Sequence, residues 1–174
     1  MDRSHQLEKW FIEYEKDVTN YLVYYTGTAD VEDLVQETFL RAFRGFERFK
    51  QQSSPKTWLI SIARNSAIDH YRKKSVWQKV KEQLHNQDDQ PGVPLTDEVL
   101  LKKIEYANLY EAINQLKTTY RDVILLRGIS ELTPKEAGQV LGWSENKVNV
   151  TFFRAVKKLN SCLKEGEYFE QFIG

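Results

Sequence analysis

Residues 133–148 read Thr-Pro-Lys-Glu-Ala-Gly-Gln-Val-Leu-Gly-Trp-Ser-Glu-Asn-Lys-Val, and this stretch decides the fold of the C-terminal half. Thr133 is a good helix N-cap, and Pro134 suits the first turn of a helix because its missing amide would be unpaired there. Glu136, three residues after the cap, can complete a capping box. The pattern predicts a short helix from Pro134 to about Leu141.

A tight turn and a second helix follow directly. Gly142 supplies the left-handed geometry that ends helices, and Ser144 can cap the next one. The second helix carries apolar residues at helical spacing, namely Val148, Phe152, Val156, Leu159 and Leu163. Two helices joined by so short a turn form a helix-turn-helix, whose second helix can enter the major groove of DNA.

The polar side chains of the second helix suit DNA contacts. Those in its N-terminal half can read base edges, and the cations further along suit phosphates. The expected DNA-contacting residues are Ser144, Asn146, Lys147, Asn149, Thr151, Arg154, Lys157 and Lys158. For any single residue of this set, a solvated helix face is an equally good interpretation.

Three amphipathic patterns in the N-terminal half predict a compact helical domain. The apolar face of the first helix is Leu7, Trp10, Phe11, Tyr14, Val18, Tyr21, Leu22 and Tyr25. After a break at Gly27, a second helix capped by Asp30 has the face Leu34, Val35, Thr38, Phe39, Ala42, Phe43 and Phe46. Ser54 and Pro55 open a third helix, with the buried stripe Trp58, Leu59, Ile62, Ala63, Ser66 and His70.

A polar segment, residues 85–96, contains two prolines and one glycine and predicts an interdomain linker. Beyond it, apolar spacing predicts helices over residues 99–116 and 120–127, the latter ended by Gly128. No segment alternates as a strand does. The expected fold is all-α, with two small helical domains, residues 1–80 and 99–174, joined by a flexible linker over residues 81–98.

Charge is distributed unevenly along a chain whose formal net charge is zero. Residues 51–84 carry 7 basic and 2 acidic side chains, net plus 5, whereas residues 1–50 and residues 85–105 are each net minus 3. One basic block between acidic neighbours suits a local nucleic-acid contact. Favourable charge at a helix C-terminus would by itself explain Lys73 and Lys74. It does not explain Lys56, Asn65 and the polar loop beside them, a combination that can hold unstacked single-stranded DNA.

Composition argues against several classes of protein. Cys162 is the single cysteine, so no intramolecular disulfide can form and a reducing, cytoplasmic setting is expected. No apolar stretch is long enough to span a membrane, and no secretory leader precedes the first helix. The three histidines are scattered, and neither a metal-binding pattern nor a glycine-rich phosphate loop occurs. We therefore expect no enzyme activity, no cofactor and no metal.

Three strings in order resemble the extracytoplasmic-function sigma factors of the sigma-70 family. They are Asp33-Leu34-Val35-Gln36-Glu37-Thr38-Phe39-Leu40-Arg41-Ala42, then Lys56-Thr57-Trp58-Leu59-Ile60-Ser61-Ile62-Ala63-Arg64-Asn65, and finally Thr133 through Lys158. The resemblance covers residues 6 to 163. It implies a transcription initiation factor that binds bacterial core RNA polymerase and directs promoter recognition and DNA melting.

The resemblance also implies roles for particular residues. The first string implies contact with the β′ clamp helices of polymerase through Asp33, Gln36, Glu37 and Arg41, which recur at helical spacing as a polar stripe. The β subunit is a further polymerase partner that the resemblance implies. The second implies capture of the melted minus-ten element by Lys56, Trp58, Arg64, Asn65, Asp69 and Arg72. The helix-turn-helix set would read the duplex minus-thirty-five element. An anti-sigma factor is a further partner that the resemblance implies.

The chain departs from the family at four positions. Asn149 and Thr151 stand where the family usually has lysine and arginine, so upstream contacts are expected to be weaker. Ala137 and Gly138 replace the commoner isoleucine and alanine, which predicts a loss of packing and of helix propensity.

The alternative function is a conventional helix-turn-helix regulator that acts without incorporation into polymerase. Such a protein would bind an operator tightly by itself, usually as a dimer on a palindrome. The C-terminal tail, with Tyr168, Phe169, Phe172 and Ile173, lies beyond the resemblance and fits either packing on the last helix or contact with a regulator.

Overall fold

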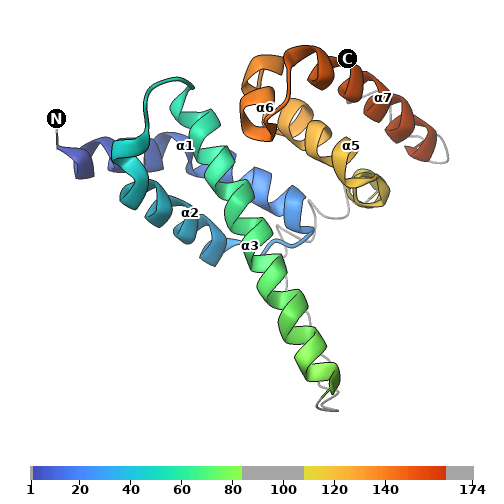
Figure 1. Ribbon diagram of the computed structural model, residues 1–174, viewed down its shortest axis with the longest axis horizontal. Coiled ribbons are helices and arrows are strands. Elements are labelled where there is room, and N and C mark those ends of the chain that lie inside the picture. The colour runs from blue at the N-terminus through green and yellow to red at the C-terminus, as the bar shows by residue number, and fades with distance from the viewer. Residues whose placement is uncertain (1, 84–107, 164–174) are drawn as a thin grey trace.

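The computed structural model describes residues 2–83 and 108–163, all of whose regular elements are helices (Figure 1). The elements are α1 Arg3–Thr26, α2 Glu32–Gly45, the 3-10 helix η1 Phe46–Arg48, α3 Pro55–Gln83, a helical segment over residues 108–115, α5 Thr118–Val123, the π-helix η2 Ile124–Ile129, α6 Pro134–Leu141 and α7 Glu145–Leu163. The all-α prediction is confirmed. The expected linker began at residue 81, but α3 continues to Gln83, because the helical backbone extends past the predicted boundary. The rest of that linker, the start of the fourth helix at residue 99 and the aromatic tail lie outside the described residues.

The first three helices pack against one another as an N-terminal bundle. Its buried apolar residues are Leu7, Trp10, Val18, Tyr21, Leu22, Val31, Val35, Ala42, Leu59, Ile60, Ala63 and Ala67. At one end, the Trp10 ring lies 5.5 Å from Phe46 and 5.2 Å from Phe49, measured between ring centroids, and Trp58 closes the cluster 5.0 Å from Phe49. These aromatic contacts fix the loop that joins η1 to α3.

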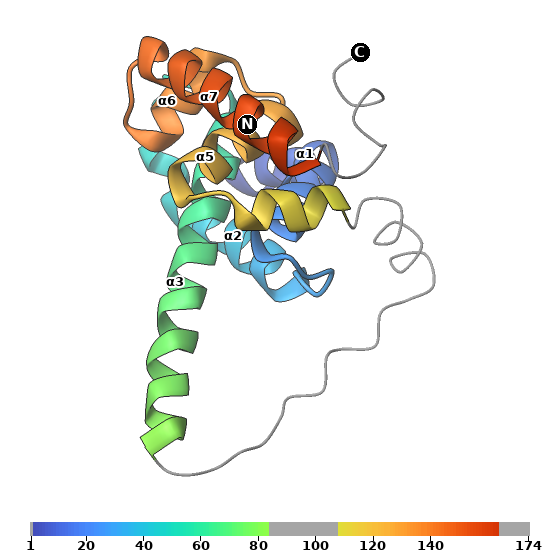
Figure 2. The same ribbon diagram turned by 90° about the vertical axis from the view of Figure 1, so that its right-hand side faces the viewer.

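Three side chains expected in the core of this bundle are not buried, and one of them is Phe11, which is 44% exposed on α1. His70 is exposed, because the C-terminal part of α3 projects beyond the bundle, as Figure 2 shows, and residues 70–80 are all exposed. Phe43 is 45% exposed at the outer edge of α2, where the Arg3 guanidinium lies 4.7 Å from its ring centroid. Helical spacing predicts which residues share a face, but not where the neighbouring helix ends.

Most of the expected helix ends are confirmed. The Thr57 amide donates to Ser54 Oγ at 3.1 Å, and the Lys147 amide donates to Ser144 Oγ at 3.2 Å. The capping box of α6 is complete in both directions, and Gly142 ends that helix with a φ of 68°. Two predictions are wrong. The N-cap position of α2 is held by Val31 and not by Asp30, and the chain stays helical through Gly128 because the wider turns of η2 carry it to Ile129.

The C-terminal half packs α7 against α5, η2 and α6. Val148 is fully buried, and Phe152 is partly buried against the same core, as expected. Gly138 corrects an expectation: a Cβ at this position would lie 2.5 Å from the Trp143 carbonyl oxygen. The missing side chain is therefore required by the tight turn and does not simply loosen the packing.

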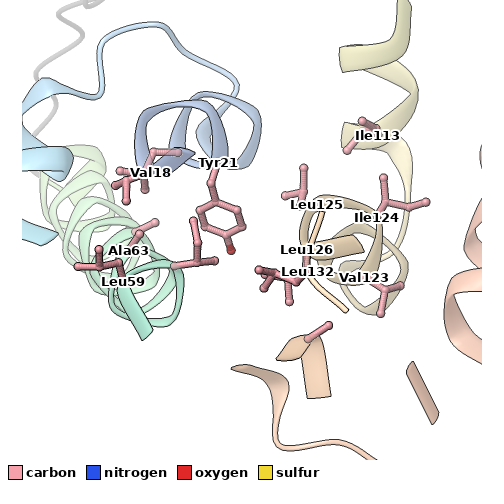
Figure 3. Close-up of a cluster of buried hydrophobic side chains, with 14 of the residues drawn as sticks. Val18, Tyr21, Leu59, Ala63, Ile113, Val123, Ile124, Leu125, Leu126 and Leu132 are labelled. Carbon is pink, nitrogen blue, oxygen red and sulfur yellow. The ribbon is translucent and has the colours of Figure 1, made fainter. Parts of the chain in front are cut away.

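The two halves are docked on each other through one continuous core. Helix α1 contacts η2, and α3 contacts α6. Figure 3 shows Tyr21 of α1 between Leu59 and Ala63 on one side and Leu125, Leu126 and Leu132 of the C-terminal half on the other. The sequence predicted each half but did not predict this contact.

Candidate nucleic-acid and protein interfaces

Helix α7 separates its buried and exposed faces clearly. Val148, Ala155 and Leu159 are buried, so the helix is anchored along one side. The predicted DNA-contacting residues lie largely on the other side: Thr151 is half-buried, and Ser144, Asn146, Lys147, Asn149, Arg154, Lys157 and Lys158 are exposed. The structure therefore places the predicted set on an accessible surface, where it forms a polar and cationic face.

Three members of that set have other contacts within the protein, and one of them is Lys157, whose ammonium lies 5.9 Å from the Phe153 ring centroid. Ser144 caps α7, so its hydroxyl already accepts a backbone amide hydrogen bond. The Lys147 ammonium lies 4.3 Å from the Trp143 ring centroid, a cation–π contact that orients it near the start of the helix. Asn146, Asn149 and Arg154 are the better candidates for direct contacts with DNA.

The exposed face of α7 also carries two apolar residues that sequence reasoning missed. Val150 is 41% exposed and Phe153 is 68% exposed. They follow Asn146 at steps of four and seven, so helical spacing could have found them on the same face. Apolar side chains beside polar ones are suited to thymine methyl groups in the major groove.

The residues expected at the minus-ten element do not form one surface. Helical spacing places Trp58, Asn65, Asp69 and Arg72 on one face of α3, whereas Lys56 and Arg64 point elsewhere. Lys56 Nζ lies 3.4 Å from Asp17 Oδ1 on α1. Asn65 and Arg72 are exposed, while Trp58 is partly buried in the aromatic cluster.

Arg64 faces the C-terminal half. Its Nη2 donates to Asp122 Oδ2 at 3.1 Å, and the Arg64 side chain is 20% exposed and that of Asp122 8%. Burial by itself lowers the pKa of Arg64, but the hydrogen bond and the charge of Asp122 outweigh burial and raise it. Arg64 is therefore a permanent cation paired with a residue 58 positions away.

A hollow of about 430 Å³ lies between the start of α1 and the loop before α3. It is lined by Gln6, Trp10, Phe46, Phe49, Gln51, Ser53 and Pro55. Aromatic walls with amide and hydroxyl groups at the rim are suited to a flat heterocycle such as an unstacked base. Sequence reasoning pointed to this loop but missed Trp10, Phe46 and Phe49 as its walls.

The predicted polar stripe of α2 is partly tied to α3. Arg41 Nε donates to Glu37 Oε1, and Arg41 Nη1 donates to Asp69 Oδ2, both at 2.8 Å. The hydrogen bond from Arg41 holds the pKa of the Asp69 carboxyl below its usual value. Asp33 and Gln36 are exposed. The stripe and the exposed face of α3 are thus neighbouring surfaces joined by Arg41.

Leu40 is a further residue of the stripe that sequence reasoning missed. It is 42% exposed and lies seven residues after Asp33 and four after Gln36, so it shares their face. An exposed leucine surrounded by polar residues is typical of a protein-binding surface.

Among the described residues, no cluster of three or more histidine, cysteine, aspartate or glutamate side chains could hold a metal ion. Within residues 2–83 and 108–163, no helix is both long enough and apolar enough to cross a bilayer.

Comparison with known proteins gives two family matches in chain order. Residues 10–76 match the model for Sigma-70 region 2, and residues 106–159 match that for Sigma-70 region 4. The RNA polymerase sigma factor YlaC of Bacillus subtilis is 30% identical over 98% of this chain and 99% of its own length. The ECF RNA polymerase sigma factor SigX of the same organism is 33% identical over 87% of this chain and 80% of its own.

Two solved structures share the fold. The sigma factor RpoE of Bartonella quintana, in complex with the anti-sigma factor NepR, gives a TM-score of 0.71 at 21% identity and covers 91% of this chain and 97% of its own. CnrH, in complex with the cytosolic domain of CnrY, also gives 0.71, at 22% identity, with 94% of this chain and 91% of its own covered.

Proposed function

This chain belongs to the extracytoplasmic-function sigma factors of the sigma-70 family, and from that premise we propose how its surfaces divide the work of transcription initiation. It is a sigma factor that binds core RNA polymerase and directs promoter recognition. The observation that carries this function is the presence of both sigma regions, in order, in one chain. The proposed domains remain residues 1–80 and 99–174, with residues 81–98 between them.

Core polymerase docks on α2 in this proposal. Asp33, Gln36, Glu37 and Arg41 contact the β′ clamp helices, with Leu40 as the apolar centre of the surface. The exposure of Asp33, Gln36 and Leu40 supports the assignment. Exposed polar residues around an apolar anchor are the usual composition of a protein interface.

The melted minus-ten strand binds along α3 and its preceding loop. Asn65 and Arg72 contact the strand from the exposed face of α3, and the aromatic hollow beside the loop takes an unstacked base. Lys56 supplies a phosphate contact from the loop side. Trp58 supports the wall of the hollow by packing against Phe49. Asp69 does not contact the strand in this proposal but accepts a hydrogen bond from Arg41 and so orients that side chain.

The duplex minus-thirty-five element binds along α7. Asn146, Lys147, Asn149 and Thr151 face the base edges, and Arg154, Lys157 and Lys158 contact phosphates. Phe153 and Val150 add apolar contacts to thymine methyl groups. Asn149 and Thr151 carry no charge. We therefore expect binding of the minus-thirty-five element by α7 to depend more on the phosphate contacts of Arg154, Lys157 and Lys158 than it does in related sigma factors.

We further propose a cytoplasmic, non-catalytic protein that is held by an anti-sigma factor. Sigma factors are known as transcription initiation factors, which supports the absence of catalysis. The complexes of RpoE with NepR and of CnrH with CnrY support a regulator of this kind.

The test is transcription from a library of genomic fragments by purified bacterial core polymerase, with and without this chain. We expect start sites that occur only with the chain and share two spaced upstream motifs. If core polymerase stays unable to find promoters while the chain alone shifts a discrete fragment, the conventional helix-turn-helix regulator is the better account.

A further inference from the structure

The last turns of α3, residues 73–83, form a surface that the proposed function does not use, and we call them the α3 extension. The extension projects from the N-terminal bundle, as Figure 2 shows, and its residues up to Val80 are all exposed. Residues 77–83 also lie beyond the match to Sigma-70 region 2, which ends at residue 76. Neither packing in the bundle nor the matched family region therefore accounts for this part of the helix.

Three apolar side chains form a stripe along the α3 extension. Val76 is 63% exposed, Trp77 60% and Val80 38%. They stand one and four residues apart, so they share one side of the helix. Trp77 is the most exposed of the four tryptophans in the chain. Exposed apolar side chains that adjoin one another in this way mark an interaction site, whereas scattered ones do not.

Tyr71 fixes the direction in which the apolar stripe faces. The Tyr71 hydroxyl donates to the Thr26 carbonyl oxygen at 2.9 Å, which ties the base of the extension to the end of α1. Val76 and Val80 follow Tyr71 by five and nine residues, and this spacing places them on the opposite side of α3. The stripe therefore faces away from the end of α1 and is accessible to a partner.

Lysines border the stripe on both sides. Helical spacing places Lys79 along one edge and Lys74 and Lys81 along the other. The Lys81 ammonium lies 6.0 Å from the Trp77 ring centroid, so the lysine stem follows the stripe while its charge stays at the edge. Residues 73–83 carry four basic side chains and one acidic side chain, net plus 3. The partner of this surface is therefore expected to carry negative charge.

The arrangement of apolar and charged residues suits a membrane surface better than other anionic partners. A helix that lies in a bilayer interface has an apolar centre, cationic edges that reach the lipid head groups, and often a tryptophan at the boundary. Duplex DNA would attract the lysines, but its grooves are lined mainly by polar base edges, which suit the polar face of α7 better than an aliphatic stripe. A second copy of the extension would bring like charges together.

We propose that the α3 extension is an interfacial helix that binds the surface of a bilayer containing anionic phospholipids. The apolar stripe enters the boundary between head groups and acyl chains, and the bordering lysines contact the lipid phosphates. Its described part is about 16 Å long and strongly charged, so it lies on the membrane and does not cross it. This inference goes beyond the proposed function, because it concerns residues that neither polymerase nor promoter binding employs.

The test is binding of the whole chain to vesicles made of equal parts of phosphatidylglycerol and phosphatidylcholine. Flotation in a density gradient gives the partition constant, and quenching of tryptophan fluorescence by brominated acyl chains reports insertion. We expect binding to these vesicles, little binding to phosphatidylcholine alone, and weaker binding as salt is added, because salt screens the lysines. Trp77→Phe should still bind but should lose most of the quenching, since Trp77 is the tryptophan placed in the bilayer.

Two pairs of variants locate the binding surface. Trp77→Ala should lower the partition constant about tenfold, because a large apolar side chain no longer leaves water. Its matched control is Ile12→Ala, which truncates an exposed apolar residue of α1 and should change nothing. Lys79→Gln with Lys81→Gln should lower the partition constant about thirtyfold.

The charge control is Lys9→Gln with Lys16→Gln, two exposed positions of α1, which should leave the partition constant unchanged. Circular dichroism shows whether each variant keeps its helices. Equal partition of Trp77→Ala and Ile12→Ala would overturn the proposal, and so would equal partition of the two lysine double variants. A chain that ignores the vesicles, yet loses affinity for duplex DNA of unrelated sequence when Lys79 and Lys81 are replaced, would show that this surface binds DNA instead.

Discussion

Gly138 lies where the turn of the helix-turn-helix folds back onto α6. The Gly142 amide donates to the Gly138 carbonyl, and so does the Trp143 amide at 2.9 Å, which draws the turn against the helix. The backbone comes so close that no side chain fits at residue 138. A small residue at this point is therefore a condition for the very short turn, and the turn sets the position of α7.

Gly138→Ala should destabilise the chain by about 1 to 3 kcal/mol, because the added methyl group would displace the Trp143 carbonyl. Gly128→Ala is the matched control, since a Cβ there would meet nothing within 4 Å. Alanine at residue 128 should be neutral or stabilise by up to about 1 kcal/mol through helix propensity. Urea unfolding measures both, and equal midpoints would contradict this reading of the turn.

On α2, the residues that pack in the core lie on one face, and the residues proposed to bind polymerase lie on another. Val35, Thr38 and Ala42 are buried, and the polar stripe with Leu40 faces away from them. Arg41 belongs to both functions, because it bridges Glu37 and Asp69. Substitutions at the exposed positions are therefore cleaner probes of polymerase binding than substitution of Arg41.

Leu40→Ala, alone or with Gln36→Ala, should weaken binding to core polymerase about tenfold, because an exposed apolar anchor would be lost. Ile12→Ala, which truncates a 79% exposed residue of α1, should have little effect. Fluorescence anisotropy of labelled chain against core polymerase gives the affinities. Unchanged affinity for the Leu40 variant, with stability within about 0.5 kcal/mol of wild type, would remove α2 from the polymerase interface.

On α7, substitutions of two neighbouring residues should have different effects, one on the preferred DNA sequence and the other on the affinity for DNA of any sequence. Phe153→Ala should change the preferred base at one position, because it removes an apolar contact. Arg154→Ala should weaken binding to all sequences and reduce the salt dependence of log K by about one. Selection from randomised upstream duplexes and salt titration test these outcomes. A uniform loss of affinity in both variants would contradict the division proposed for the helix.

At the scale of the whole molecule, the buried contact between halves predicts a response to alkaline pH. Burial raises the pKa of Tyr21 well above its usual value and also that of Tyr110, while the charge of Asp122 adds to the effect at Tyr21. A raised pKa means that the docked state favours the protonated phenol. Its stabilising contribution is complete below the ordinary tyrosine pKa of about 10 and is lost as pH rises above that value.

We therefore expect the halves to separate above about pH 10, together with ionisation of the buried tyrosines. Phenolate absorbance near 295 nm, recorded alongside the radius of gyration from X-ray scattering, follows both events. Tyr21→Phe should delay the separation to higher pH. A single titration of all nine tyrosines near pH 10, with no change in size, would show that these phenols are not held in the docked contact.

The sequence by itself determined the local structure of this protein, and it also indicated the family to which the protein belongs. Caps at Ser54, Thr133 and Ser144 and the turn at Gly142 were predictable because they depend on residues within one helical turn. Helical spacing likewise predicted the accessible face of α7. Some predictions from helical spacing were wrong. His70 was expected to be buried but lies where α3 has no neighbouring helix among the described residues, and the helix expected to end at Gly128 continues through the wider turns of η2.

Only the tertiary structure showed which residues of the N-terminal half pack against the C-terminal half. The pairing of Arg64 with Asp122, the burial of Tyr21 between the halves and the contact of Gln139 with residue 52 join residues 58 or more positions apart. Periodicity shows that a helix has an apolar face but does not say which element buries it, because many partners satisfy the same pattern. A residue that the sequence predicts as a DNA contact, such as Arg64, can therefore form an internal ion pair.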